Sequence, residues 1–319
     1  MRRYVIKRLA QAVGVLWAAY TVSFLVLDFL PGDPVTAMAG AGMDSGQVDP
    51  AQLAALRHEY GFDKPVPAQY AEYLGRAVRG DFGDAVSSGR PVTSVIGDAL
   101  PQTLQLTGAA LLLAVVLGGG LAMVATYTSR RWLRQLLLSL PPLGVSVPTF
   151  WVGLLLVETF SFRLRWFPAF GNDGLRGLVL PALTLAVPTG ALVAQVLAKS
   201  LLTALDQAYV ETVRAKGAGR RRVHLRHALR NASLPALTVV GLLVGQLIAG
   251  SVVVETVFSR DGLGRVTAAA VTAQDIPLVQ GVVVFGALIF VATNLIVDLV
   301  YPLLDPRIVV ASDRRASFA

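Results

Sequence analysis

The sequence predicts an all-α integral membrane protein with six transmembrane helices. The first observation is composition, since 54% of the 319 residues are apolar and 15% are charged, whereas soluble domains carry about 25% charged residues. The second is that six charge-free runs are long enough to cross a bilayer of ~30 Å at ~1.5 Å per residue. The third is the placement of Lys and Arg between the runs. Together they exclude a disordered, collagen-like or disulfide-stapled chain. The sequence contains no cysteine, so cysteine usage does not indicate the redox compartment.

The six runs are expected to be helices because a charge inside the bilayer costs several kcal/mol. The first follows four basic residues, as a signal peptide would, but its 19 residues are too long and no small-residue cleavage site follows, so we expect a retained helix. The runs lie between Arg8 and Asp28, Asp98 and Arg130, Arg134 and Glu158, Arg176 and Lys199, Arg230 and Glu255, and Asp275 and Asp298.

The connections between the runs differ in charge. The two termini and the segments 128–135 and 199–230 hold 18 Lys and Arg against 4 Asp and Glu, whereas the other three connections hold 10 against 12. Basic residues favour the cytoplasmic side of a membrane. We therefore expect a multi-pass protein of the bacterial cytoplasmic membrane with both termini in the cytoplasm. The net charge of +8 reflects this topology and needs no nucleic-acid partner.

The connection after the first run is long enough to carry structure of its own. Asp49 is an expected N-cap for a helix ending near Gly61, and a second amphipathic helix is expected from Pro67 to Val78. A solvated linker is the alternative. The expected parts are 1–30 (N-terminus and first helix), 31–98 (external helical segment), 94–304 (five-helix transmembrane domain with the loop 199–231) and 305–319 (cytoplasmic tail).

The connection 199–231 is the most informative segment. We expect two helices, Leu201–Lys216 and Arg220–Asn231, because Gly217-Ala218-Gly219 ends a helix and reverses the chain. Three arginines of the second helix, at 222, 226 and 230, form a stripe beside an apolar face. One interpretation is a helix lying flat on anionic lipid headgroups. The alternative is an elbow that contacts a partner protein.

A series of motifs favours the second interpretation. In chain order, the motifs are Leu30-Pro31-Gly32-Asp33-Pro34, Gly61-Phe62-Asp63-Lys64-Pro65, Gly80-Asp81-Phe82-Gly83, Ser146-Val147-Pro148-Thr149-Phe150-Trp151, Glu211-Thr212-Val213 with Gly217, Arg226-His227-Ala228-Leu229-Arg230-Asn231, Glu255-Thr256-Val257-Phe258-Ser259, Gly262-Leu263-Gly264-Arg265 and Asp305-Pro306-Arg307-Ile308. With these motifs in this order, the sequence resembles the permease subunits of ATP-binding-cassette importers of the dipeptide, oligopeptide and nickel family, and among them the B-type dipeptide permeases.

The resemblance implies a type I importer permease fold and a subunit that forms half of a path for di- or oligopeptides. Its expected partners are a homologous second permease, two ATPase subunits or domains, an extracellular substrate-binding protein and the lipid bilayer. The loop 206–222 would contact the ATPase through Asp206, Tyr209, Val210, Glu211, Arg214, Ala215, Lys216, Gly217, Arg220 and Arg221. The sequence departs from the family at Thr212-Val213, where the loop signature has two alanines, and at Arg260-Asp261, where an aromatic residue and a proline are usual.

The chain itself is not expected to be an enzyme. None of its four lysines sits in a Gly-Lys-Ser/Thr phosphate loop, so partner subunits would hydrolyse ATP. No catalytic residue, cofactor or metal site is expected. Candidate path residues are Glu158, Gln195, Gln246, Glu255 and Asn294. An ion-gradient-driven secondary transporter is the alternative, and the substrate stays open among peptides, nickel chelates, glutathione and haem.

Overall fold

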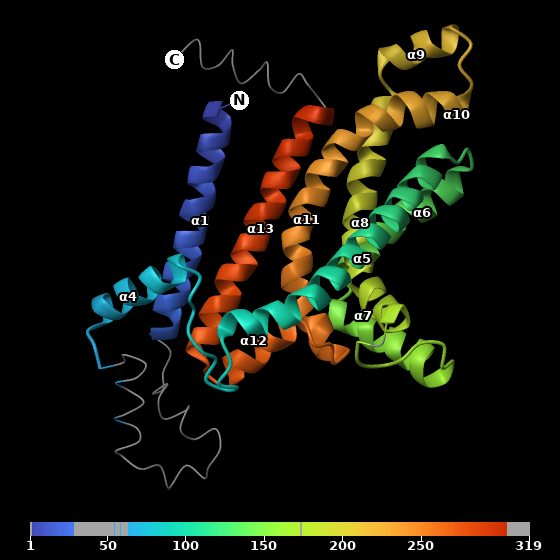
Figure 1. Ribbon diagram of the computed structural model, residues 1–319. Helices are drawn as coiled ribbons and strands as arrows, with labels where there is room; N and C mark the ends of the chain where they lie inside the picture. The colour runs from blue at the N-terminus through green and yellow to red at the C-terminus, as the bar shows by residue number, and fades with distance from the viewer. Residues whose placement is uncertain (1, 29–53, 55–57, 59–62, 173, 305–319) are drawn as a thin grey trace. The chain divides into compact units, whose positions relative to one another are not determined.

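The regular secondary structure of the part of the chain that the structure describes is all helical. The computed structural model describes residues 2–28, 54, 58, 63–172 and 174–304 (Figure 1). No strand occurs among these residues, where an isolated bridge joins Asp84 and Pro91. The all-α prediction is confirmed. The elements are α1 (Arg2–Asp28), α4 (Val66–Val78), α5 (Val92–Tyr127), α6 (Arg131–Ser146), α7 (Thr149–Leu156), the π-helix η1 (Val157–Arg163), α8 (Gly174–Leu205), α9 (Ala208–Ala215), α10 (Arg220–Arg222), the π-helix η2 (Val223–Ala228), α11 (Leu229–Val257), α12 (Leu263–Thr272) and α13 (Ile276–Leu304).

Five of the six expected spans are single helices long and apolar enough to cross a membrane, carried by α1, α5, α8, α11 and α13. The third expected span is divided, because α6 and the α7–η1 helix meet at a bend of 103°. The bend follows from Pro148, which has no N–H to donate and disfavours helical geometry at the residue before it. Val147 is accordingly extended, with ψ 128°.

The chain divides into two compact units. Unit 1 comprises residues 1–103 and 261–291. Its core joins the first turns of α5 with α12 and α13 through buried Val92, Ile96, Leu263 and Leu278. Gly281 lies so close to Val92 that a Cβ there would overlap the valine side chain. The start of α13 is therefore packed directly on α5 within this unit.

The helix α4 of unit 1 confirms the amphipathic helix expected from 67 to 78. It packs against α1, where the Tyr70 hydroxyl lies 2.7 Å from Thr21 Oγ1 and the Tyr70 ring meets Phe24 edge-on at 5.3 Å. Aromatic contacts of this geometry add to the burial of apolar area. The helix expected after Asp49 lies almost entirely outside the described residues, as does the tail 305–319.

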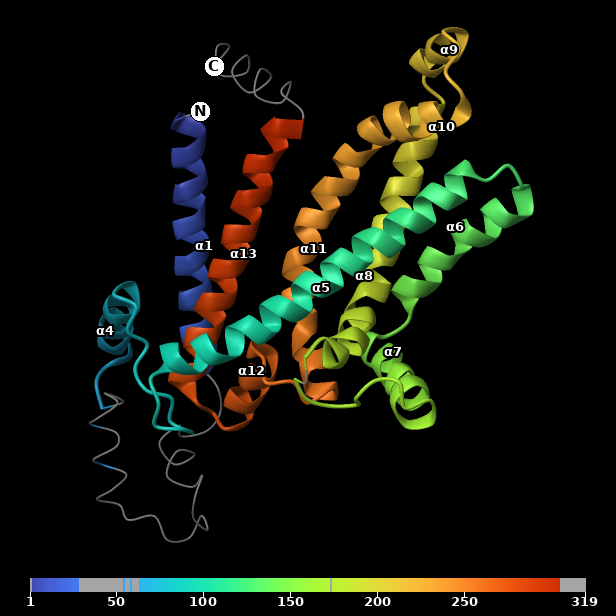
Figure 2. The same ribbon diagram turned by 45° about the vertical axis from the view of Figure 1, so that its right-hand side comes forward.

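Unit 2 comprises residues 104–260 and 292–319 and is organised around α8. Two-thirds of the apolar window of α8 is buried, 67%, against 28% for α5 and for α11. α8 packs against α6, α7 and α11 (Figure 2). The outer helices leave much apolar surface uncovered by this chain, as expected for helices that face lipid or another subunit.

The crossing of α5 and α8 brings the two backbones together. A Cβ on Gly118 would overlap the carbonyl oxygen of Gly190, and a Cβ on Gly190 would lie 3.2 Å from the carbonyl oxygen of Ala114. Small residues allow such close approach between membrane helices. α5 and α8 are thus in direct backbone contact at this point.

Candidate functional site

The candidate site is the elbow of unit 2, defined here as residues 206–228 between α8 and α11. The sequence predicted one continuous helix over Leu201–Lys216, and this is wrong. α8 ends at Leu205, two residues turn the chain, and α9 is a separate helix. The second expected helix, Arg220–Asn231, does form, as α10, η2 and the first turn of α11, with a π-helical section in place of a regular helix.

The break before α9 follows from the burial of Val210. Gln207 is extended, with ψ 147°, and its carbonyl oxygen accepts the first hydrogen bond of α9 from Val210 N at 2.9 Å. Val210 is 1% exposed, as is Val223 of η2, against which α9 packs. A straight continuation of α8 would lose this contact, so tertiary packing overrides the local helix preference.

The C-terminal end of α9 is closed by a Schellman motif at Gly217. Gly217 has φ +83°, a conformation that costs other residues energy. Its N–H donates to Arg214 O at 2.9 Å, and Ala218 N–H donates to Val213 O at 3.2 Å, the two bonds of this motif. Gly219 then adopts an extended conformation, with φ −66°. The predicted role of the Gly-x-Gly sequence, a helix stop and a reversal, is confirmed.

Arg220 anchors the elbow to the end of α5. Its guanidinium donates to Ser129 Oγ at 2.7 Å and to the carbonyl oxygen of Tyr127, and it lies 4.7 Å from the centre of the Tyr127 ring. His224 adds a contact at 3.1 Å between its Nε2 and Thr126 Oγ1. Cation–π and charged hydrogen bonds of this kind fix a side chain. The Arg220 guanidinium is therefore directed at the end of α5, although the residue stays exposed.

The other predicted contact residues divide by exposure. Val210 is buried inside the elbow and Tyr209 is half-buried, with a hydroxyl that has no hydrogen-bond partner among the described residues. Val210 therefore positions α9 instead of offering a surface. The residues with exposed side chains or backbone are Asp206, Glu211, Arg214, Ala215, Lys216, Gly217 and Arg221.

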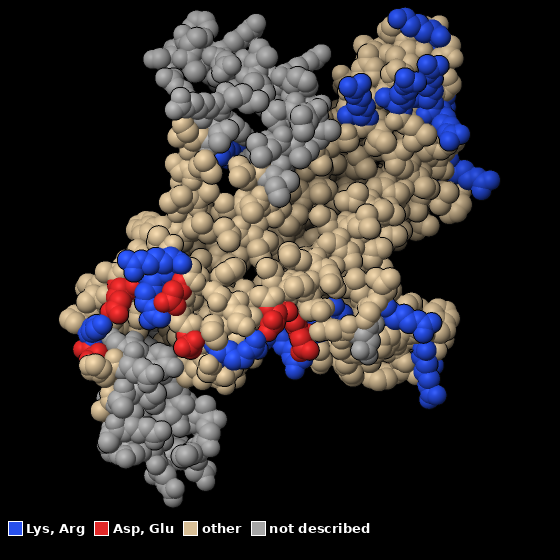
Figure 3. All heavy atoms as spheres, in the orientation of Figure 1, with Lys and Arg blue, Asp and Glu red and all other residues tan. Residues whose placement is uncertain are grey.

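The end of unit 2 that carries α9 and α10 is basic. On the face drawn in Figure 3, it shows Lys and Arg side chains and no Asp or Glu. A hollow of about 600 Å³ lies beneath α9, and its lining includes Arg134, Arg214, Arg220 and His224, with Asp206 as its acidic residue. The surface around the exposed side of α9 is thus strongly positive, which favours an acidic partner.

The five candidate path residues are spread over η1, α8, α11 and α13, and Gln246 and Glu255 share α11. Glu158 lies in η1 and pairs with Arg163 at 3.0 Å, and both side chains are more than half exposed. Gln195 of α8 and Gln246 of α11 are exposed, and Asn294 of α13 is partly buried. Glu255 is 0% exposed. Their role in a path stays a prediction.

The burial around Glu255 extends to Arg260, which sequence analysis noted only as a departure from the family pattern. Arg260 is 1% exposed, and its Nη1 donates to Gly177 O at 3.0 Å and to Gly171 O at 3.3 Å. Its backbone N–H donates to Glu255 O at 2.8 Å. The substituted residue therefore ties the end of α11 to the segment that leads into α8.

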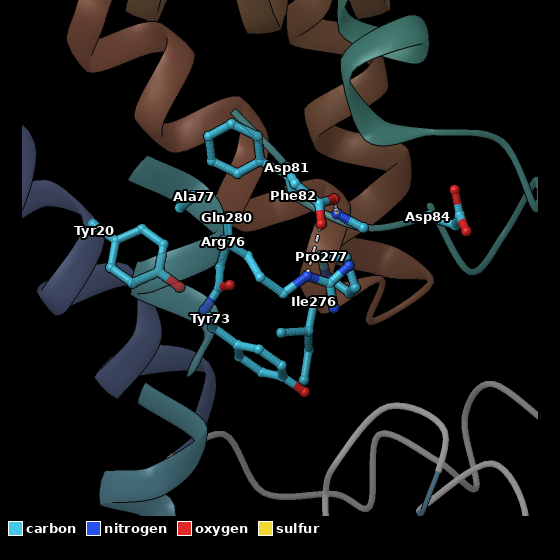
Figure 4. A pocket seen from close by; sticks show the side chains of 11 residues that line it. Tyr20, Tyr73, Arg76, Ala77, Asp81, Phe82, Asp84, Ile276, Pro277 and Gln280 are labelled. Atoms are coloured by element: carbon cyan, nitrogen blue, oxygen red, sulfur yellow. Dashed lines mark hydrogen bonds and ion pairs between the residues drawn. The ribbon is translucent and has the colours of Figure 1, made fainter. Parts of the chain in front are cut away.

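Unit 1 contains a separate hollow of about 230 Å³. Figure 4 shows the ion pair between Arg76 Nε and Asp81 Oδ2, 2.8 Å apart, with Tyr20 and Tyr73 beside it. The hydrogen bond from Arg76 holds the pKa of the Asp81 carboxyl below its usual range, and burial raises the pKa of Tyr73. Gln280 lines the same hollow, and its Nε2 is buried without a partner among the described residues.

Sequence reasoning missed several residues that hold the elbow in place. Thr126, Tyr127 and Ser129 of the α5 end receive His224 and Arg220, yet they are about ninety residues away in sequence. No local pattern marks such a contact. Arg220 was predicted as an ATPase contact, and its bonds to Ser129 and Tyr127 depend on where α5 ends.

Comparisons with known families and structures agree with this geometry. Residues 104–310 match the model for binding-protein-dependent transport system inner membrane components, and residues 1–107 match the model for the N-terminal part of such membrane components. Two inward-facing structures of the MetNI methionine ABC transporter resemble the fold. One has a TM-score of 0.57 at 16% identity and covers 66% of this chain and 96% of its own. The other has a TM-score of 0.55 at 15% identity.

Curated relatives extend the match to nearly the whole chain. The glutathione transport system permease protein GsiC of Escherichia coli (strain K12) is 36% identical over 308 residues, 97% of this chain and 99% of its own length. A Brucella suis permease protein named for a peptide transport system is 37% identical over 316 residues, with the same coverage. The chain therefore belongs to the family of inner-membrane components of binding-protein-dependent transport systems, and it is a permease subunit of an ATP-binding-cassette importer.

Proposed function

We propose that this permease carries peptides of the size range that includes dipeptides and glutathione, and that it takes no part in ATP hydrolysis. The support for the substrate is the identity of 36–37% over nearly the whole chain to permeases named for glutathione and peptide transport. The support for a purely mechanical subunit is that the sequence contains no phosphate-binding loop. ATP is then hydrolysed by separate ATPase subunits.

The observation that carries the coupling proposal is the way α9 is held. The helix is fixed from beneath by buried Val210 and closed by the Gly217 motif, while Glu211, Arg214 and Lys216 stay exposed. A short helix in this position is a rigid surface for an ATPase subunit to bind. Movement of that subunit is passed to α8 and α11, because the elbow is continuous with both helices.

Topology and further partners complete the proposal. Both termini and the elbow lie in the cytoplasm, as the distribution of Lys and Arg favours. The uncovered apolar surfaces of the outer helices, including Leu112 and Val116 of α5 and Leu242 of α11, face lipid and a homologous second permease. A substrate-binding protein delivers the peptide from outside. Among the path candidates, exposed Gln195 and Gln246 fit a polar lining best.

Reconstitution tests this proposal. The full chain is co-expressed with its second permease and ATPase subunits, and the complex is placed in liposomes with the substrate-binding protein. We expect ATP-dependent uptake of a labelled dipeptide or of glutathione. Uptake of neither by an intact complex would contradict the substrate class, and uptake driven by an ion gradient without ATP would contradict the importer mechanism.

A double variant of α9 and a control variant, both made by replacing charged side chains with glutamine, test whether α9 is the contact with the ATPase. Glu211→Gln/Arg214→Gln removes both charges from the exposed face of α9, and we expect loss of ATPase co-purification with normal insertion. The control is Arg176→Gln, an exposed residue in the first turn of α8, which should leave co-purification unchanged. Equal co-purification of the ATPase with the double variant and the control would refute the assignment of α9 as the contact.

A further inference from the structure

A second hollow near the elbow has an unusual lining. It measures about 630 Å³ and is formed by the last turns of α5, the start of α6 and the α10–η2 segment, all in unit 2. One part of its lining is cationic, from Arg130, Arg220 and Arg221, and another part is apolar. No acidic residue lines it. Its volume is within the range of small-ligand pockets.

The cationic part contains arginines in two different states. Arg220 is held by Tyr127 and Ser129, so it forms a fixed part of the wall. Arg130 and Arg221 are exposed, and neither forms an ion pair with any residue that the structure describes. Two free guanidinium groups beside a fixed one are suited to binding a phosphate group, which accepts their N–H bonds in pairs.

The apolar part consists of Met123 and Val124 of α5, Leu133 of α6 and Leu225 of η2. Val124 is 55% exposed and Leu225 is 45% exposed, so these side chains form an open apolar surface continuous with the hollow. A soluble anion such as inorganic phosphate would leave this surface in contact with water. A ligand that carries both a phosphate and a hydrocarbon chain would cover it.

We propose that this hollow binds an anionic phospholipid. The phosphate of the headgroup lies between Arg130 and Arg221, and an acyl chain lies along Val124, Leu133 and Leu225. This inference rests on the cytoplasmic side proposed above for the elbow, since basic pockets at the cytoplasmic ends of membrane helices are suited to such headgroups. The bound lipid joins the ends of α5, α6 and η2, and because Arg220 and His224 line both this hollow and the one beneath α9, it stabilises the base of the elbow.

Native mass spectrometry of the full chain tests the proposal. The protein is released from detergent after titration with phosphatidylglycerol or phosphatidylcholine, and the bound lipid is counted. We expect phosphatidylglycerol to bind the wild type in preference to phosphatidylcholine. Each arginine near an anionic headgroup contributes about a fivefold gain in affinity, so Arg130→Gln/Arg221→Gln should weaken phosphatidylglycerol binding by roughly thirtyfold.

A matched control separates a site from general attraction. Arg222→Gln/Arg226→Gln removes the same number of positive charges, both from the α10–η2 segment that carries Arg221, but neither residue lines the hollow. This variant should bind phosphatidylglycerol as the wild type does. Equal losses in the two double variants, or no loss in the first, would overturn the proposal. Displacement of the lipid by millimolar inorganic phosphate would also overturn it, because the ligand would then be a soluble anion.

Discussion

Gly217 offers a direct test of how α9 is held, because the nearby Gly219 is a matched glycine without a positive φ. A Cβ at either position meets no atom within 4 Å, so neither alanine substitution creates a clash. Gly217 has φ +83°, a conformation that costs alanine about 1 kcal/mol. Gly219 has φ −66°, which alanine adopts without strain. At Gly219 the reduced freedom of the unfolded chain even favours alanine by up to ~1 kcal/mol.

The measurement is hydrogen exchange of the full chain in lipid nanodiscs, because a membrane protein rarely unfolds in one step and local opening is the relevant event. A loss of about 1 kcal/mol corresponds to roughly fivefold faster exchange. We expect this in the peptide covering α9 for Gly217→Ala, and unchanged or slower exchange for Gly219→Ala. Exchange in α8 and α11 should stay the same in both. Equal acceleration in the two variants would refute the assignment of strain to Gly217.

Two further predictions concern packing and a buried carboxylate. Gly118→Ala places a methyl group against the carbonyl oxygen of Gly190 and should destabilise unit 2 by roughly 1–3 kcal/mol. The measurement is the midpoint of thermal aggregation in detergent, which should be lower than in the wild type. In the control Gly120→Ala the added methyl group meets no atom within 4 Å, so the midpoint should not change. Asp275 is 1% exposed and accepts hydrogen bonds from Ser87 N at 2.9 Å and Ser87 Oγ at 2.8 Å. Asp275→Ala should cost roughly 2–3 kcal/mol and speed exchange in the segment 84–90, and an unchanged exchange rate there would contradict the role given to the carboxylate.

The transmembrane helices could be predicted from the sequence because the property that marks them, the absence of charged residues, is local to each segment. A charge within the hydrocarbon layer is costly wherever the helix lies, so charge-free runs mark the spans without knowledge of the packing. The bend within the third run has a local cause in part, since Pro148 stands at the break. Its angle of 103° depends on how α7 packs against α8 and α11, and no local signal gives that angle.

The packing of the helices could not be predicted in the same way. Gly118, Gly119 and Gly120 are consecutive, and the sequence does not say which of them faces another helix. In the structure it is Gly118 that meets Gly190, while Gly120 has open space. The choice depends on the rotation of α5 relative to α8, which is a property of two segments and of neither alone.

In the elbow, too, the features set by local sequence could be predicted and those set by packing could not. Its glycine motif was predictable because a positive φ at a helix end has a strong residue preference. The break at Gln207 was not, because it serves the burial of Val210 against a segment that comes later in the chain. The contact between Arg220 and the end of α5 depends likewise on where α5 ends.

The contact between Gly118 and Gly190 also sets how far the elbow can travel. Two helices that touch through their backbones have no side-chain layer that could rearrange between them, so their crossing is a natural pivot. From Gly190 to the end of α8 at Leu205 is ~22 Å along the helix. A rotation of about 10° at the crossing would therefore shift the elbow by about 4 Å, roughly three-quarters of a helical turn, while the pivot itself stays in place.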